Sequence, residues 1–163
     1  MEEKKYIKRY ILTEEGYKKL QEEIKRTEEE LRKVLFAKGE AAEVGGNVWH
    51  DNFSFEQLVR EEYVLSKKIQ ELKQKLSNAE IVKMSDLKDT GVARLGSKII
   101  VEYEDGKQKE FIISDPEITD PSKGIISYQS PIGKALFGAK EGDERKYIAG
   151  GKVFKIKIIK VLL

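Results

Sequence analysis

The stretch that decides the fold is residues 13–44, TEEGYKKLQEEIKRTEEELRKVLFAKGEAAEV. Thr13 is a good helix N-cap, and Glu14 and Glu15 follow in the first turn, where acidic side chains suit the positive end of the helix dipole. From there one set of residues recurs at alternating spacings of three and four: Tyr17, Leu20, Ile24, Thr27, Leu31, Val34, Lys38 and Ala41. This narrow stripe between charged residues predicts a helix that packs against one partner helix.

The partner helix follows a glycine turn. The first pattern stops near Gly45 and Gly46, since paired glycines end helices, and a second pattern begins after Asp51. Its stripe, in which Glu62 is the one polar member, consists of Phe55, Leu58, Glu62, Leu65, Ile69, Leu72 and Leu76. The two stripes predict an antiparallel hairpin whose arms are about 45 Å long, with the turn at the far end.

The composition changes after residue 79, where no long helical pattern continues. The sequence predicts strands at 98–104, 107–114, 124–129, 145–149 and 152–161, with two-residue turns at Asp105-Gly106 and Gly150-Gly151. Ser130 and Pro131 suit the N-cap and first position of a short helix that ends at Gly138. The predicted fold is therefore α+β, with a coiled-coil hairpin at 1–78, whose tip is about 44–52, and a small β-rich domain at 79–163.

Composition restricts the class of protein. The 163 residues contain no cysteine and carry a net charge of +2, and basic and acidic side chains balance through residue 78. Because binding to nucleic acid usually needs a basic face, a protein partner is favoured. No apolar run approaches the ~20 residues of a membrane span, and the N-terminus does not resemble a signal peptide. We expect a cytoplasmic monomer, since the hairpin satisfies both stripes.

Four segments, in this order, resemble the Gre family of bacterial transcription elongation factors. They are ILTEEGYKKL at 11–20, EAAEVG at 40–45, LSNAE at 76–80 and SPIGKALFG at 130–138, the last followed by KEGD at 140–143. The resemblance implies an FKBP-like second domain that docks on RNA polymerase, and a hairpin that enters the polymerase secondary channel. It also implies that the protein is not itself an enzyme and meets nascent RNA only within that channel.

The family's tip carries two acidic residues that help to hold a second Mg²⁺ ion and a water molecule in the polymerase active site. Asp51 and Asn52 match the second acidic position and the asparagine after it, with Asp where Glu is usual. The first position is not matched, because Gly46 or Asn47 stands there. The resemblance thus implies that Asp51 is a metal-orienting carboxylate, and that Mg²⁺ is shared with the polymerase instead of being bound stably by this chain.

Other interpretations of the tip remain open. Asn47 or His50 is a candidate neutral substitute for the missing carboxylate, and Asp51 is also placed to cap the second helix. A single histidine without clustered partners is a poor transition-metal signal, which favours a surface or packing role for His50. Trp49 suits either packing or a contact with polymerase.

The resemblance also implies that the second domain binds polymerase through the start of the most specific matching segment, which consists of Ser130, Pro131, Ile132 and Gly133. Three functions compete: a factor that stimulates cleavage of backtracked RNA, a channel-binding factor that inhibits or regulates transcription without cleavage, and an FKBP-like prolyl isomerase or chaperone. The missing first carboxylate of the tip is the feature that distinguishes the first two functions, since cleavage depends on the tip carboxylates. The third needs an aromatic-lined pocket, for which residues after 80 offer Phe111, Phe137, Phe154 and a few tyrosines.

Overall fold

The computed structural model describes residues 10–44, 53–87 and 90–163. These form two compact units, one of residues 18–78 and one that groups residues 10–17 with 79–163. The sequence-based domains 1–78 and 79–163 stay a prediction, and the contacts place residues 10–17 with the C-terminal residues. Within the described ranges, no helix is long and apolar enough to cross a membrane.

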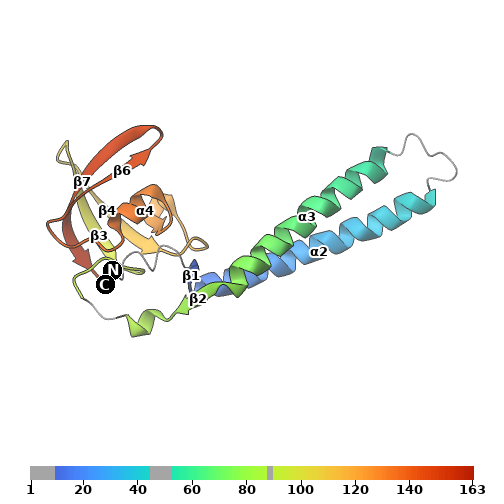
Figure 1. Ribbon diagram of the computed structural model, residues 1–163, viewed down its shortest axis with the longest axis horizontal. Coiled ribbons are helices and arrows are strands. Elements are labelled where there is room, and N and C mark those ends of the chain that lie inside the picture. The colour runs from blue at the N-terminus through green and yellow to red at the C-terminus, as the bar shows by residue number, and fades with distance from the viewer. Residues whose placement is uncertain (1–9, 45–52, 88–89) are drawn as a thin grey trace. The chain divides into compact units, whose positions relative to one another are not determined.

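Two long helices form the first unit, and they run as an antiparallel hairpin (Figure 1). Helix α2 (Glu14–Val44) has 31 residues and helix α3 (Phe53–Ser77) has 25. At 1.5 Å per residue they are about 46 and 38 Å long, which confirms the predicted arms. The predicted cap is also present, since the Gly16 amide donates to Thr13 Oγ1 at 3.0 Å.

The predicted stripes lie between the two helices. Their buried members are Leu20, Ile24, Thr27, Val34, Ile69 and Leu72. Thr27 is tolerated there because its hydroxyl donates to the carbonyl of Glu23 at 2.8 Å. Each large apolar member contributes about 1.5–3 kcal/mol by leaving water, so the stripes hold the hairpin together.

A five-stranded sheet forms the second unit (Figure 1), in the order β5 (Ile125–Ser127), β4 (Gln108–Ser114), β3 (Lys98–Tyr103), β7 (Lys152–Leu162), β6 (Glu144–Ala149). All neighbours are antiparallel except β4 and β5. Helix α4 (Pro131–Leu136) lies against β5 and β6, and its Leu136 joins a core that includes Ile99, Val101, Ile113 and Ile158. The α+β class with a helical hairpin and a β-rich domain is confirmed.

The turn at Asp105-Gly106 differs from the prediction in its length. The Tyr103 amide donates to the Lys107 carbonyl at 2.9 Å, which encloses three residues instead of two. Gly106 has a φ of +77°, so glycine is needed there, while Lys107 N donates to Asp105 Oδ1 at 3.1 Å. The extra residue follows from this left-handed glycine, which closes a three-residue loop.

A small parallel sheet escapes sequence reasoning. Strand β1 (Tyr10–Thr13) pairs with β2 (Ala79–Val82), and two short 3₁₀ helices occupy Met84–Asp86 and Pro121–Lys123. Each strand has four residues, too few to show a period, and the pairing joins segments far apart in the sequence. Ile11 and Leu12 are buried, and Ile11 belongs to the core cluster of the five-stranded sheet, so the opening segment is part of the second unit.

Candidate functional site

The predicted catalytic tip lies outside the described residues. Asn47, His50, Asp51 and Asn52 all fall between Val44, where α2 ends, and Phe53, where α3 begins. Their roles as metal-orienting, capping or packing residues therefore stay predictions. Among the described residues, no group of three or more His, Asp or Glu is placed to hold a metal ion.

Next to the tip, the hairpin carries an ion pair inside its stripe. Lys38 and Glu62, the charged members of the two predicted stripes, form a salt bridge, and their side chains are only 29% and 30% exposed. Each charged side chain is tolerated in its stripe because the other one neutralises it. A half-buried pair of this kind fixes how the two helices align, because removing either partner leaves the other charge poorly solvated.

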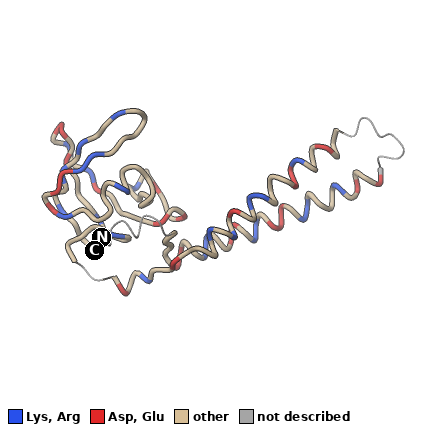
Figure 2. Tube along the Cα trace, in the orientation of Figure 1, with Lys and Arg blue, Asp and Glu red and all other residues tan. Residues whose placement is uncertain are grey.

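Two further ion pairs join the helices closer to the base of the hairpin. Lys68 Nζ lies 2.9 Å from Glu23 Oε1, and Lys73 Nζ lies 2.6 Å from Glu28 Oε1. The hydrogen bond from Lys68 holds the pKa of Glu23 below its ordinary value, and Lys73 lowers the pKa of Glu28 in the same way. Figure 2 shows basic and acidic residues distributed along both helices.

The outer surface of the hairpin changes character along its length. Large apolar side chains that are exposed to solvent occur only between residues 35 and 64 of the described hairpin: Leu35, Phe36, Phe53, Val59, Tyr63 and Val64. From residue 65 to the end of α3, and before residue 35 in α2, the described exposed positions are polar or charged. The half nearest the tip is therefore the half with apolar surface to offer a partner.

In the second unit, the predicted docking segment begins helix α4. Ser130 is its N-cap, because Ser130 Oγ accepts from the Gly133 amide at 3.0 Å while donating to the Ser127 carbonyl at 2.7 Å. Pro131 occupies the first helical turn. Gly133 is required by packing, since a Cβ there would lie 1.9 Å from the Ser127 carbonyl oxygen. The predicted cap and first position are confirmed.

These contacts separate the docking candidates by what a partner can reach. Gly133 is buried, and Ser130 and Ile132 are half-buried, with Ile132 packed against the core. Pro131 is exposed, as is Lys134 one turn later. A partner that binds this segment would touch Pro131 and Lys134, whereas Ser130 and Gly133 would act by shaping the turn.

Sequence reasoning missed Asp115, a fully buried carboxylate that holds the start of α2. Asp115 Oδ2 accepts from the Thr13 amide at 3.0 Å and also from the Thr13 hydroxyl, and Oδ1 accepts from the amides of Glu117 and Ile118 at 2.9 and 3.1 Å. A Cβ at Gly16 would come within 2.5 Å of its oxygens. The local signal was an aspartate between a strand and Pro116, which is typical of a turn but does not reveal its distant partner.

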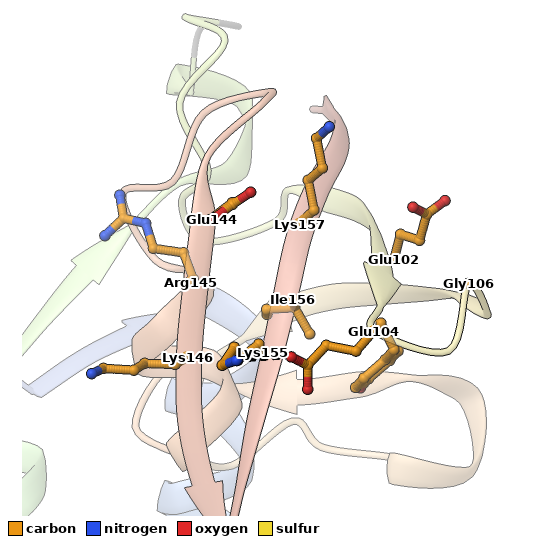
Figure 3. A pocket seen from close by; sticks show the side chains of 10 residues that line it. Glu102, Glu104, Gly106, Glu144, Arg145, Lys146, Lys155, Ile156 and Lys157 are labelled. Atoms are coloured by element: carbon orange, nitrogen blue, oxygen red, sulfur yellow. Dashed lines mark hydrogen bonds and ion pairs between the residues drawn. The ribbon is translucent and has the colours of Figure 1, made fainter.

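One pocket of the second unit gives no selective site. It has a volume of about 640 Å³ and lies against β3, β6 and β7 (Figure 3). Three carboxylates and four cations line it: Glu102, Glu104, Glu144, Arg145, Lys146, Lys155 and Lys157. Lys155 is already paired with Glu104 at 2.9 Å. Because charges of both signs line it, the pocket favours no particular sign of ligand.

Several aromatic residues of the second unit contact one another. Phe137 packs against Tyr128 with ring centroids 6.1 Å apart, while Phe154 stacks on Tyr147 at 5.1 Å and meets Tyr103 edge-on at 6.5 Å. Burial raises the pKa of Tyr103, which shares a hydrogen bond with Tyr147. Phe111 and Phe137 pack against the core of the sheet, and Phe154 contacts Tyr103 and Tyr147.

Comparison with known proteins covers both units. A family model described as "Transcription elongation factor, N-terminal" matches residues 10–81, and one described as "Transcription elongation factor, GreA/GreB, C-term" matches residues 88–162. The protein named transcription elongation factor GreA from Syntrophobacter fumaroxidans is 32% identical over 154 residues, which cover 94% of this chain and 97% of that protein. The GreA of Clostridium acetobutylicum is also 32% identical, over 155 residues, with the same coverage.

A solved structure is more distant. The crystal structure of GreA factor homolog 1 from Thermus thermophilus is 23% identical and covers 96% of this chain and 100% of that one, with a TM-score of 0.46. At this similarity the solved structure carries no functional argument. The family of the chain is shown by the matches to the two family models and to the curated relatives.

Proposed function

The chain belongs to the GreA/GreB family of transcription elongation factors, and we propose that it acts by binding RNA polymerase and inserting its hairpin into the secondary channel. In this proposal the polymerase carries out the chemistry of RNA cleavage, and the chain serves as a cofactor protein that reaches the polymerase active site. Nascent RNA is met only inside that channel.

The observation that carries the proposal is the self-contained hairpin. Its stripe residues, such as Leu20, Ile24 and Leu72, are buried between α2 and α3, so the hairpin needs no further partner to cover them. With arms of about 46 and 38 Å, α2 ends at Val44 and α3 begins at Phe53, at the end of the hairpin opposite to residues 18 and 78. A rod of this build suits delivery of a short loop into a deep, narrow passage.

The sequence between the two helices contains one carboxylate in residues 45–52. Mg²⁺ prefers oxygen ligands, and Asp51 supplies an anionic oxygen while Asn47 and Asn52 supply amide oxygens. These are too few to complete the coordination of a metal ion, so the donor set fits a site completed by the polymerase. When bound, Mg²⁺ supplies Lewis-acid stabilisation of the attacking and leaving oxygens of a phosphodiester.

Docking of the second unit is assigned to the exposed side chains of the α4 segment. Pro131 and Lys134 would contact the polymerase, while Ser130 and Gly133 keep the turn in shape through the cap and the close approach to Ser127. Pro131→Ala is expected to weaken polymerase binding with little effect on the melting temperature. Equal weakening by Lys123→Ala, a substitution of an exposed lysine outside α4, would argue against a specific role for this segment.

A second candidate function rests on the tip sequence. Between Gly45 and Phe55 there is one acidic residue, Asp51, where the family pattern has two. A chain that enters the channel without a complete set of carboxylates would occupy it and regulate elongation without stimulating cleavage.

A cleavage assay on backtracked elongation complexes separates the two candidates. Wild type, Asp51→Ala and Glu40→Ala are compared, the last removing an exposed carboxylate from the side of α2. The cleavage function predicts that wild type and Glu40→Ala stimulate hydrolysis and that Asp51→Ala loses most of it. Stimulation that survives the loss of Asp51 would rule out a catalytic tip, and polymerase binding by an inactive wild type would support the regulatory function.

A further inference from the structure

The exposed apolar side chains of the hairpin form a group that its own fold does not explain. We name Leu35, Phe36, Phe53, Val59, Tyr63 and Val64 the distal belt. Phe36 is 70% exposed, Tyr63 68% and Val64 61%. Isolated exposed apolar residues are ordinary, but six of them confined to one half of a charged hairpin indicate a surface that a partner covers.

The belt residues point away from the seam between the helices. Phe36 lies two positions from Val34 and from Lys38, both stripe residues, and two positions are about 200° around a helix, so Phe36 faces the opposite side of α2. Tyr63 and Val64 are consecutive, which separates them by about 100° on α3. The belt therefore presents apolar side chains in several directions and forms no single face.

This distribution limits what can cover the belt. A flat partner, including a second copy of this chain, would bury one side and leave the others in water. A membrane surface likewise needs the apolar side chains on one face of a helix. A protein cavity that encloses the rod would cover them all, and it must admit two helices of about 10–12 Å diameter with axes about 8–10 Å apart.

We infer that the distal belt is the contact surface of the hairpin with an apolar-walled, enclosing cavity of RNA polymerase. The inference rests on the proposed function and assigns to it a specific, mainly apolar contact that is distinct from the tip. In the charged half of the hairpin, the pairs Glu23–Lys68 and Glu28–Lys73 hold the two helices together. The belt, in the other half, makes the contact with the polymerase.

Binding measurements with matched variants test the contact. The double variant Phe36→Ala/Tyr63→Ala removes belt side chains, and Ile148→Ala/Val153→Ala removes a pair of similar exposure, 63% and 58%, from the β6–β7 hairpin. We expect the belt variant to bind polymerase at least about tenfold more weakly, because removal of a buried aromatic anchor commonly lowers affinity by that much. The affinity of the control variant should stay within about twofold of wild type. Unfolding curves should match wild type for both.

Enclosure is tested by labelling. Since the chain has no cysteine, Phe36→Cys, Tyr63→Cys and Val64→Cys each give a single attachment point for an environment-sensitive fluorophore. An enclosing cavity shifts the emission of all three to the blue on adding polymerase. A shift at one position alone would overturn enclosure, as would self-association of wild type that is lost in the belt variant, or blue shifts with anionic lipid vesicles in place of polymerase.

The outcomes also separate this inference from the proposed function. If wild type and the belt variant bind polymerase equally, the belt is not the contact, and the proposed function stands. If wild type does not bind polymerase at all, both fail.

Discussion

The two halves of the hairpin share one helical pattern but differ in how they use their residues. In the half near residues 18 and 78, Leu20, Ile24, Ile69 and Leu72 are buried between the helices, and the described exposed positions are polar or charged. In the half near the tip, the seam contains the Lys38–Glu62 ion pair, while apolar side chains face outward.

The difference shows that stability and recognition are divided along the rod. In the base half, the apolar residues pack between α2 and α3 and hold the two helices together. The seam of the tip half contains a charge pair in place of apolar contacts, and Phe36 and Tyr63 lie outside it and are mostly exposed to solvent. Substitutions in the base half should therefore change folding, and substitutions on the outside of the tip half should change binding.

The largest expected effect is on the seam of the base half. Leu72→Ala removes a nearly fully buried side chain, so it should lower the free energy of unfolding by about 2–4 kcal/mol through lost burial and the cavity left behind. Denaturant unfolding followed by helical circular dichroism measures it.

The matched control is Val64→Ala in the tip half. Its side chain is exposed, so the free energy of unfolding should change by less than about 0.5 kcal/mol. Equal losses for the two variants would contradict the division of roles, because they would place Val64 in a packed seam.

How far sequence reasoning reached follows the same division. The stripes, the caps at Thr13 and Ser130 and most strands depend on neighbours within a few residues, and all were predicted. The β1–β2 pair and the Thr13–Asp115 contacts join positions far apart in the chain, for which a single sequence holds no local signal. Glu62 stood out as the polar member of its stripe, but only the fold shows that it meets Lys38.

The candidate site was predictable in part. The helix at α4 was predicted from its turn chemistry and its docking role from the family resemblance, yet which of its side chains a partner can reach depended on burial: Pro131 is exposed and Gly133 is not. The distal belt was missed because a residue's exposure follows from which helix faces are paired. Phe36 could have been noted as an apolar residue opposite the stripe.

A smaller effect is expected at the ion pair of the tip half. Lys38→Ala leaves Glu62 half-buried without its partner, which should cost about 1–2 kcal/mol. Replacing both residues, as Lys38→Met/Glu62→Leu, should be neutral or stabilising because the apolar stripe is then continuous. A separate double-mutant cycle, in which wild type, Lys38→Ala, Glu62→Ala and Lys38→Ala/Glu62→Ala are unfolded, gives the coupling energy of the pair. Additive losses would show that the pair does not couple the helices.

The smallest effect is a pH dependence that belongs to the base half. The pKa values of Glu23 and Glu28 lie below the ordinary 4.5 of a glutamate because Lys68 and Lys73 donate to them. Between the ordinary and the lowered pKa the unfolded chain binds more protons, so the contribution of these pairs is complete above about pH 4.5 and is lost as the pH falls through the lowered values. Melting temperatures from pH 7 to pH 3 should therefore fall more steeply in wild type than in Lys68→Gln/Lys73→Gln. Parallel profiles would show that the pairs do not bridge the helices in solution.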